Sequence, residues 1–346
     1  MRVKFITTEH NNNNKKLGII YLLPRPVQPL KESSYTKGQS QQSTPRSERR
    51  RHWQSTLREY FKCISNIMAH ITVSPSHHFA GIMQQKVDTL HTMMEKELTY
   101  SCCDYLNNDD CDEDIHDEYT AAISYKVTLD DRAKIVDWCY RVVDRFQLYR
   151  DSVAMAMNMV DRFLSNPYQL PSSGFPPYFS HQEILHDRIM YQLLVVSALY
   201  IVIKIQARVL FSADKLADVS QGIYSVEDIE AMERAILYCL SWRVCAPTAF
   251  QVGCVILELM VSHVQEANTT VVDGGRWESI RQELAFQTEN AVRDYQLTTQ
   301  RPSTVAFMAI LSAIEIDQHA KDGENMLLCK AMLNIFAEVK SLPTQE

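Results

Sequence analysis

Apolar residues recur at helical spacing through most of the chain after about residue 79. This pattern predicts a helix within residues 76–106, followed later by a denser helical region. In that region, Ile135–Phe146 reads as one amphipathic helix and Val153–Leu164 as a second. Ser152 is the expected N-cap of the second helix, because a serine hydroxyl can accept a hydrogen bond from a backbone N–H of the first turn.

The next predicted helix, Ile189 to about Lys204, is apolar on nearly all sides. A helix of this kind is normally buried by others around it, and this one is too short to cross a membrane comfortably. A short helix over Ala213–Val219 should follow. Another should begin at Ser225, where Asp228 completes a variant of the capping box.

Pro247 then stops helix propagation, and Thr248 can cap a new helix. A second helical set is expected after it, comprising Ala249–Val264, Trp277–Tyr295, Thr304–Ile316 and Met326–Val339. Gly274-Gly275 is expected to lie in a polar loop before the second of these. The chain is therefore predicted to be all-α, with a wholly buried helix inside the first set.

Charge is distributed unevenly along the 346 residues, whose net charge is −7. Residues 1–60 carry 12 Lys and Arg against 4 Asp and Glu, so the remainder is strongly acidic. Residues 1–75 are expected to be a disordered basic arm, and residues 107–130 an acidic linker. The sequence Arg49-Arg50-Arg51 can be read as a nuclear import signal or as a solvated tail. An acidic core argues against direct nucleic-acid binding by the core.

The nine cysteines form no CxxC pair, which is typical of a protein in a reducing compartment. Cys102, Cys103 and Cys111, near Asp112 and His116, fit no zinc spacing, so we expect no metal. No phosphate-binding loop, GxSxG or HExxH motif occurs. We therefore expect a non-catalytic, intracellular protein without a cofactor or a membrane span.

Two charge pairs do not fit the apolar pattern around them. Glu233 lies on an apolar stripe, and a buried carboxylate needs a partner, for which Lys204 is the candidate. Arg132 and Asp161 are a second candidate pair, able to tie two helices together through a bidentate contact. The pattern alone also allows Lys204 and Glu233 to be ordinary surface charges at helix edges.

Several segments resemble the cyclin box. Arg132–Trp138 is similar to its opening, Asn158–Ser165 to its second-helix signature, and Gln192–Lys204 to its buried third helix. The positions most characteristic of kinase-binding cyclins all match: Arg132, Asp161, Leu193, Lys204 and Glu233. The resemblance implies tandem five-helix cyclin boxes, at residues 131–246 and, in divergent form, 247–341, preceded by an N-terminal helix.

The resemblance implies that the protein is a regulatory subunit that binds and activates a cyclin-dependent Ser/Thr protein kinase in cell-cycle control. Lys204 and Glu233 would bond to backbone groups near the regulatory helix of the kinase, and Arg132 with Asp161 would be a structural ion pair. Apolar kinase contacts would come from Ile201, Ile205, Leu237 and Trp242. Substrates or inhibitors of the kinase are further candidate partners. The nucleus is the expected location, with the cytoplasm left open.

Two departures from the family pattern stand out. The usual aromatic-Glu-Glu after Lys204 is replaced by Ile205-Gln206-Ala207, which removes two carboxylates beside the docking pair. The family's substrate-docking patch is degenerate here, with Asp131 and Lys134 at positions that are usually apolar. The positions of that patch are Ile135, Trp138, Arg141 and Gln192. We expect that a basic-leucine substrate motif does not bind there.

Two alternatives remain at this point. The chain could be a cyclin-fold protein acting in transcription, either with a transcriptional kinase or as a scaffold of the general transcription factor B type. The second form commonly has a basic DNA-binding face and a zinc ribbon. The acidic core and the absence of paired cysteines argue against it.

Overall fold

The structure, a computed structural model, describes residues 81–106, 126–165, 179, 181–206, 211–266, 272–316 and 322–342. Every regular element in these ranges is a helix, and all of them belong to one compact unit, residues 55–346. The α-helices are α2 (Gly81–Thr99), α3 (Leu129–Arg145), α4 (Ser152–Leu164), α5 (His181–His186), α6 (Arg188–Gln206), α7 (Ala213–Val219), α8 (Val226–Cys239), α9 (Ala249–Glu266), α10 (Gly274–Arg293), α11 (Pro302–Ile316) and α12 (Asp322–Ser341), with a 3-10 turn, η1, at Tyr295–Leu297. The expected disordered arm, residues 1–75, lies outside the described residues, as does most of the acidic linker.

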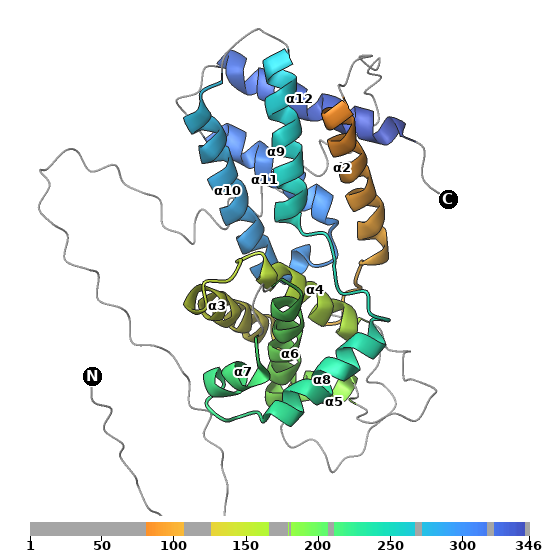
Figure 1. The fold of residues 1–346 in the computed structure, drawn as a ribbon, viewed down its shortest axis with the longest axis vertical. Helices are drawn as coiled ribbons and strands as arrows, with labels where there is room; N and C mark the ends of the chain where they lie inside the picture. Colours follow the sequence, from red (N-terminus) through yellow and green to blue (C-terminus); the bar gives the residue numbers. More distant parts are fainter. Residues whose placement is uncertain are drawn as a thin grey trace, which may run out of the picture. The chain divides into compact units, whose positions relative to one another are not determined.

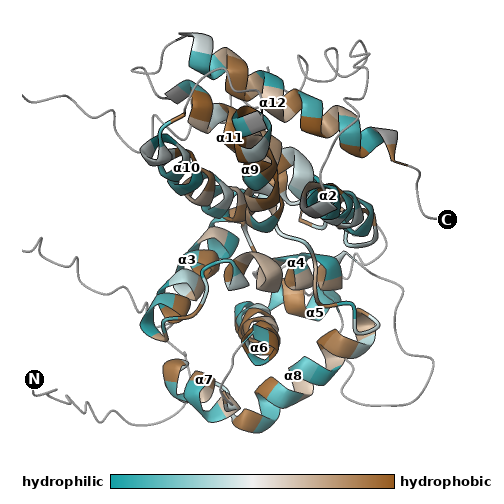
Figure 2. Ribbon diagram, turned by 45° about the horizontal axis from the view of Figure 1, so that its top comes forward, coloured by the Kyte–Doolittle hydropathy of each residue, from teal (hydrophilic) through white to brown (hydrophobic). Residues whose placement is uncertain are grey.

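Helix α6 is the centre of the first helical set. Figure 2 shows it end-on, surrounded by α3, α4, α7 and α8, all of which contact it. It has 19 residues, more than predicted, and contrary to the prediction it is long and apolar enough to cross a membrane. The other helices, however, bury Tyr191 and every side chain from Leu193 to Ile203. This burial agrees with the prediction of a central core helix, because an all-apolar surface is stabilised only when other helices cover it.

The second set consists of α9, α10, α11 and α12, and α2 packs against it. Helix α2 runs beside α9 and also contacts α11 and α12 (Figure 1). The segment after α2 then reaches the first set, where Tyr105 and Leu106 join its buried core. The helix that precedes the first set in sequence therefore supports the second set in space.

Helix starts show where local sequence rules succeed. The Ser225–Asp228 capping box is present in full, as predicted, and Thr248 Oγ1 accepts a hydrogen bond from Gln251 N at 3.1 Å. A further capping box, Thr128–Asp131, caps α3, which begins at Leu129. The helix therefore begins two residues before residue 131, where the first cyclin box was expected to begin.

Two local predictions were wrong. Asp151 rather than Ser152 occupies the N-cap position of α4, and Ser152 is already helical, with its Oγ bonded to Gln206 Oε1. Gly274 and Gly275 open α10 instead of lying in a loop, and Asp273 occupies the N-cap position. In both places tertiary contacts and backbone geometry outweigh the local preference of the residue.

Candidate functional site

Lys204 and Glu233 lie side by side where the end of α6 meets α8. Lys204 Nζ is 2.7 Å from Glu233 Oε1, and the side chains are 43% and 11% exposed. The Lys204 ammonium also lies 4.7 Å from the centre of the Tyr200 ring, a cation–π arrangement. The pair predicted from the pattern is therefore formed, with its lysine open to solvent and its carboxylate mostly covered.

Apolar side chains that are at least partly exposed follow both members of this pair along the chain. Ile205 follows Lys204 at the end of α6, while Leu237 is half-buried on α8. Trp242 is among the most exposed large side chains, and its ring makes an edge contact with Tyr238, with 6.4 Å between ring centroids. Tyr238 did not enter the sequence prediction, since an exposed tyrosine on a helix carries no distinguishing pattern.

Ile201 is not part of this surface. It is only 3% exposed and belongs to the apolar core, although the family resemblance assigned it a contact with the kinase. The physical reason is that α6 is enclosed from Leu193 to Ile203, so at the C-terminal end of the helix exposure begins only at Lys204. In this structure Ile201 packs within the core of the first helical set.

The turn after α8 directs Trp242 outward. Ser241 and Trp242 both adopt positive φ angles, 49° and 62°, and Trp242 N donates to Leu237 O at 2.9 Å. Such φ values are unfavourable for residues with side chains, so the surrounding structure must hold the turn in place.

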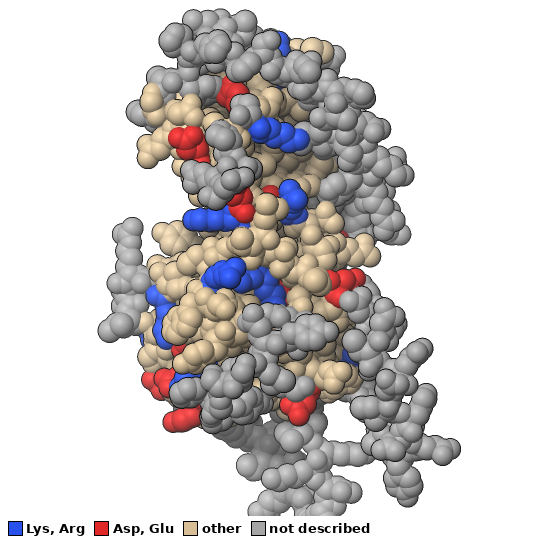
Figure 3. Space-filling view, turned by 90° about the vertical axis from the view of Figure 1, so that its right-hand side faces the viewer, with Lys and Arg blue, Asp and Glu red and all other residues tan. Residues whose placement is uncertain are grey.

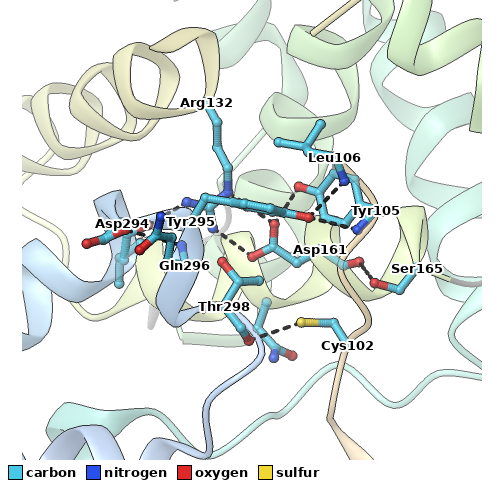
Figure 4. A network of polar contacts seen from close by, with 12 residues as sticks. Cys102, Tyr105, Leu106, Arg132, Asp161, Ser165, Asp294, Tyr295, Gln296 and Thr298 are labelled. Atoms are coloured by element: carbon cyan, nitrogen blue, oxygen red, sulfur yellow. Dashed lines mark hydrogen bonds and ion pairs between the residues drawn. The ribbon is translucent and has the colours of Figure 1, made fainter. Parts of the chain in front are cut away.

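Arg132 and Asp161 form a buried bidentate contact between α3 and α4 (Figure 4). Arg132 donates from Nη2 to Asp161 Oδ2 at 2.7 Å and from Nε to Asp161 Oδ1 at 3.2 Å. Its third nitrogen, Nη1, donates to Val292 O at 2.7 Å, near the end of α10. The Arg132 guanidinium therefore links two helices of the first set, α3 and α4, to α10 of the second set.

Two tyrosines complete this network. Tyr105 Oη donates to Asp161 Oδ1 at 2.7 Å, and burial, together with the nearby Asp161 charge, raises the pKa of Tyr105 well above its usual value. Tyr295 Oη accepts hydrogen bonds from Tyr105 N and Leu106 N, and donates to Asp104. Sequence reasoning missed both tyrosines, because their partners lie about 56 and 190 residues away along the chain.

Ion pairs also connect α3 and its following loop to α10. Arg150 contacts Glu289 at 2.6 Å, and Arg293 contacts Asp137 at 2.5 Å. The guanidinium groups of Arg150 and Arg293 each lie 4.6 Å from the centre of the Tyr140 ring. The two helical sets are thus joined by charge-assisted contacts in addition to apolar packing.

The four positions of the expected substrate-docking patch do not form an exposed apolar surface. Ile135 is buried, Trp138 and Gln192 are half-buried, and Arg141 is exposed. Asp131 closes the capping box of α3 and pairs with Arg188 at 3.1 Å, so its departure from the family pattern has a structural role.

A cavity of about 510 Å³ lies between the two sets, away from the Lys204–Glu233 pair. Two buried oxygens that line it, Asn158 Oδ1 and Thr298 Oγ1, accept no hydrogen bond from any described residue. Among the described residues no group of three or more His, Cys, Asp or Glu side chains could hold a metal ion.

Comparisons with known proteins show that the chain is similar to cyclins. A family model described as the cyclin N-terminal domain matches residues 101–245, which include Lys204, Glu233, Arg132 and Asp161. Cyclin-B1-5 of rice (Oryza sativa subsp. japonica) is 24% identical over 272 residues, covering 75% of this chain and 52% of that protein. Cyclin-A1-2 of rice is 26% identical over 198 residues, covering 57% of this chain and 36% of that protein.

The G2/mitotic-specific cyclin-2 of Antirrhinum majus is 29% identical over 119 residues, covering 34% of this chain and 23% of that protein. Among solved structures, a viral cyclin from herpesvirus saimiri matches with a TM-score of 0.44 and 14% identity, covering 63% of this chain and 87% of that one. The chain spans about half or less of the length of these curated relatives. The described residues of the chain are all helical in their regular elements, residues 101–245 match the cyclin N-terminal domain, and the chain is similar to A- and B-type cyclins of plants.

Proposed function

We propose that this chain is the regulatory subunit of a cyclin-dependent Ser/Thr protein kinase, and that it binds the kinase through a docking face centred on Lys204 and Glu233. The observation that carries the proposal is the partial exposure of this one ion pair at the end of a buried helix. Ile205, Leu237 and Trp242 supply apolar surface around it, and Tyr238 extends that surface.

The pair offers complementary hydrogen-bonding groups to a partner backbone. Lys204 gives one of its three ammonium donors to Glu233, and no other described residue accepts from it. Glu233 Oε2 accepts no hydrogen bond from a described residue. A free donor beside a free acceptor suits the exposed C=O and N–H groups found at a helix end or loop of a kinase.

Activation would follow from preferential binding. A kinase whose regulatory helix is rotated inward pairs the helix glutamate with the ATP-binding lysine and opens its activation loop. A cyclin that binds this state more tightly than the inactive one shifts the population toward it and supplies no catalytic group. The name of the Antirrhinum relative, G2/mitotic-specific, supports a role in cell-cycle control, and Arg49–Arg51 supports a nuclear location.

The double variant Lys204→Ala/Glu233→Ala tests the proposal. When the double variant is purified from cells, the kinase activity that co-purifies with it should be about a tenth or less of the activity that co-purifies with the wild-type chain. The reason is that truncating central charged contacts typically costs this much binding. The thermal unfolding of the double variant should match wild type. The control is Asp130→Ala/Lys134→Ala, which removes an exposed ion pair of α3.

Two results would contradict the proposal. Kinase activity captured at the wild-type level would show that Lys204 and Glu233 do not form the docking face. Loss of folding in the double variant would instead assign the pair a structural role.

A further inference from the structure

Arg162 is a buried guanidinium that lacks an acidic partner. It lies on α4, is 8% exposed, and forms no ion pair with any described residue. Its neighbour in sequence, Asp161, is already engaged by Arg132. Burial lowers the pKa of Arg162, which reflects the cost of holding this charge away from water. A buried charge without compensation is unfavourable, so a counter-charge from outside the chain would stabilise it.

The contacts that Arg162 makes leave some of the N–H donors of its guanidinium group without a described partner. Nη1 donates to Arg243 O at 2.7 Å, and the guanidinium lies 4.5 Å from the centre of the Tyr100 ring. Its other N–H groups donate to no described residue, and they are not sealed from solvent. The guanidinium is therefore held in position from two sides, with donors still available to a ligand.

These donors face a pocket of about 240 Å³ formed by three segments: the end of α2, the end of α4 and the turn after α8. Its lining contains Arg162 and Arg243, the hydroxyl-bearing residues Thr99, Ser101, Ser165 and Ser241, and no carboxylate. Arg243 is exposed, and its side chain makes no hydrogen bond or ion pair with a described residue. Figure 3 shows Lys and Arg side chains across the middle of the face that lies to the right in Figure 1.

We propose that this pocket binds the phosphoryl group of a phosphoserine or phosphothreonine on a protein partner. Guanidinium forks match the geometry of phosphate oxygens, and clusters of arginine are a general means of recognising phosphorylated side chains. Two arginines without carboxylates would neutralise the charge of the phosphoryl group.

The choice of a protein side chain as the source of the phosphoryl group rests on the proposed function, because a bound kinase would produce such groups on its protein substrates. The anion site itself rests on Arg162 and Arg243 and does not depend on the kinase. Binding can therefore be measured on the full chain alone, while kinase capture is measured separately.

The test uses a short peptide with one phosphoserine flanked by uncharged residues, titrated calorimetrically into the full chain. The phosphopeptide should bind at least about tenfold more tightly than its unphosphorylated form, since charge-assisted hydrogen bonds contribute this much. Arg243→Gln, a change at an exposed position, should weaken binding by about tenfold. The exposed Arg145→Gln on α3 is the matched control and should leave binding unchanged.

The role of Arg162 is tested by Arg162→Lys, which keeps the charge and removes the fork. Binding by this variant should fall by about tenfold. The proposal is overturned if Arg243→Gln binds as tightly as wild type, or if the two peptides bind equally. Inorganic phosphate competing as effectively as the phosphopeptide would overturn the protein source and assign the pocket to free phosphate. Lys204→Ala/Glu233→Ala should retain phosphopeptide binding whatever its effect on the kinase.

Discussion

Two ion pairs in this chain have the same sequence separation and the same shortest contact but lie in different surroundings. Arg132–Asp161 and Lys204–Glu233 each join residues 29 apart in sequence, and each has a shortest contact of 2.7 Å. The first pair is enclosed, with side chains 2% and 4% exposed, whereas the lysine of the second is 43% exposed. The comparison teaches that exposure, and not the contact itself, separates a structural brace from a surface that can bind a partner.

The largest difference between the pairs should appear when a carboxylate is removed. Asp161→Ala leaves Arg132 charged in the core, and we expect the free energy of unfolding to fall by about 3–5 kcal/mol. Glu233→Ala should cost less than about 1 kcal/mol, because Lys204 can reach water. Urea unfolding followed by circular dichroism measures both. Similar losses in the two variants would break the distinction.

Tyr105→Phe should have the next largest effect. The change removes the hydroxyl that donates to Asp161 at 2.7 Å inside the core, and hydrogen bonds to charged groups contribute about 1.5–3 kcal/mol. Thermal and urea unfolding should show a loss in this range. Tyr149→Phe is the control, because Tyr149 is 71% exposed, and its stability should equal wild type. A neutral effect of Tyr105→Phe would mean that Arg132 alone holds the carboxylate.

Glu97 sharpens the comparison, since it is buried like Asp161 but forms no ion pair with a described residue. It accepts hydrogen bonds from Ser303 N and Oγ at 2.9 and 2.6 Å, at the start of α11. Burial raises the pKa of Glu97 above its ordinary value, although the Ser303 hydrogen bonds oppose this. The folded state therefore binds a proton more tightly than the unfolded state in the window between the two pKa values.

Stability should accordingly fall as the pH rises through that window, which starts near the ordinary pKa of 4.5. Glu97→Gln should remove this part of the pH dependence, because its amide does not titrate. Unfolding free energies of both proteins, measured from pH 4 to 7 (about the titration range of a perturbed carboxyl), give the difference. The assignment would be contradicted if the unfolding free energy of wild type minus that of Glu97→Gln stayed constant with pH, or if it increased as the pH rose.

The smallest effect concerns salt. A double-mutant cycle on Lys204 and Glu233 should give a coupling energy of about 0.2–1 kcal/mol that decreases when salt is added. The coupling of Arg132 with Asp161 should be larger and insensitive to salt, because counter-ions cannot approach the enclosed pair. Equal salt dependence in the two cycles would show that the exposures seen here do not control their electrostatics.

Sequence reasoning predicted local features well wherever the chain supplies its own partner. The Ser225–Asp228 capping box and the Thr248 cap are formed, and α7 has the predicted bounds Ala213–Val219. The all-α fold and the buried α6 also follow from helical periodicity alone. The prediction for Ser152 failed because Asp151 takes the cap position and the Ser152 hydroxyl bonds to Gln206, 54 residues away.

The candidate site divides in the same way. Lys204 could be named in advance as the candidate partner of Glu233, because a carboxylate on an apolar stripe needs a cation and α6 ends in one, although the pattern also allowed two ordinary surface charges. Tyr295 and Arg293 could not be assigned, since their partners Tyr105 and Asp137 lie more than 150 residues away, and nothing in the local pattern marks them. Ile201, which the family resemblance assigned a contact with the kinase, is buried, and local sequence does not show how far the enclosure of α6 extends.

The amino-acid sequence by itself determined where helices form and which helix is central, because periodicity and capping act within a few residues. The tertiary structure alone decided which charges are covered. Asp161 and Arg162 are neighbours in the chain, yet packing gives the first a cation and leaves the second without an acid. Such differences depend on groups that converge from α2, α4 and the turn after α8, and therefore exist only once the chain has folded.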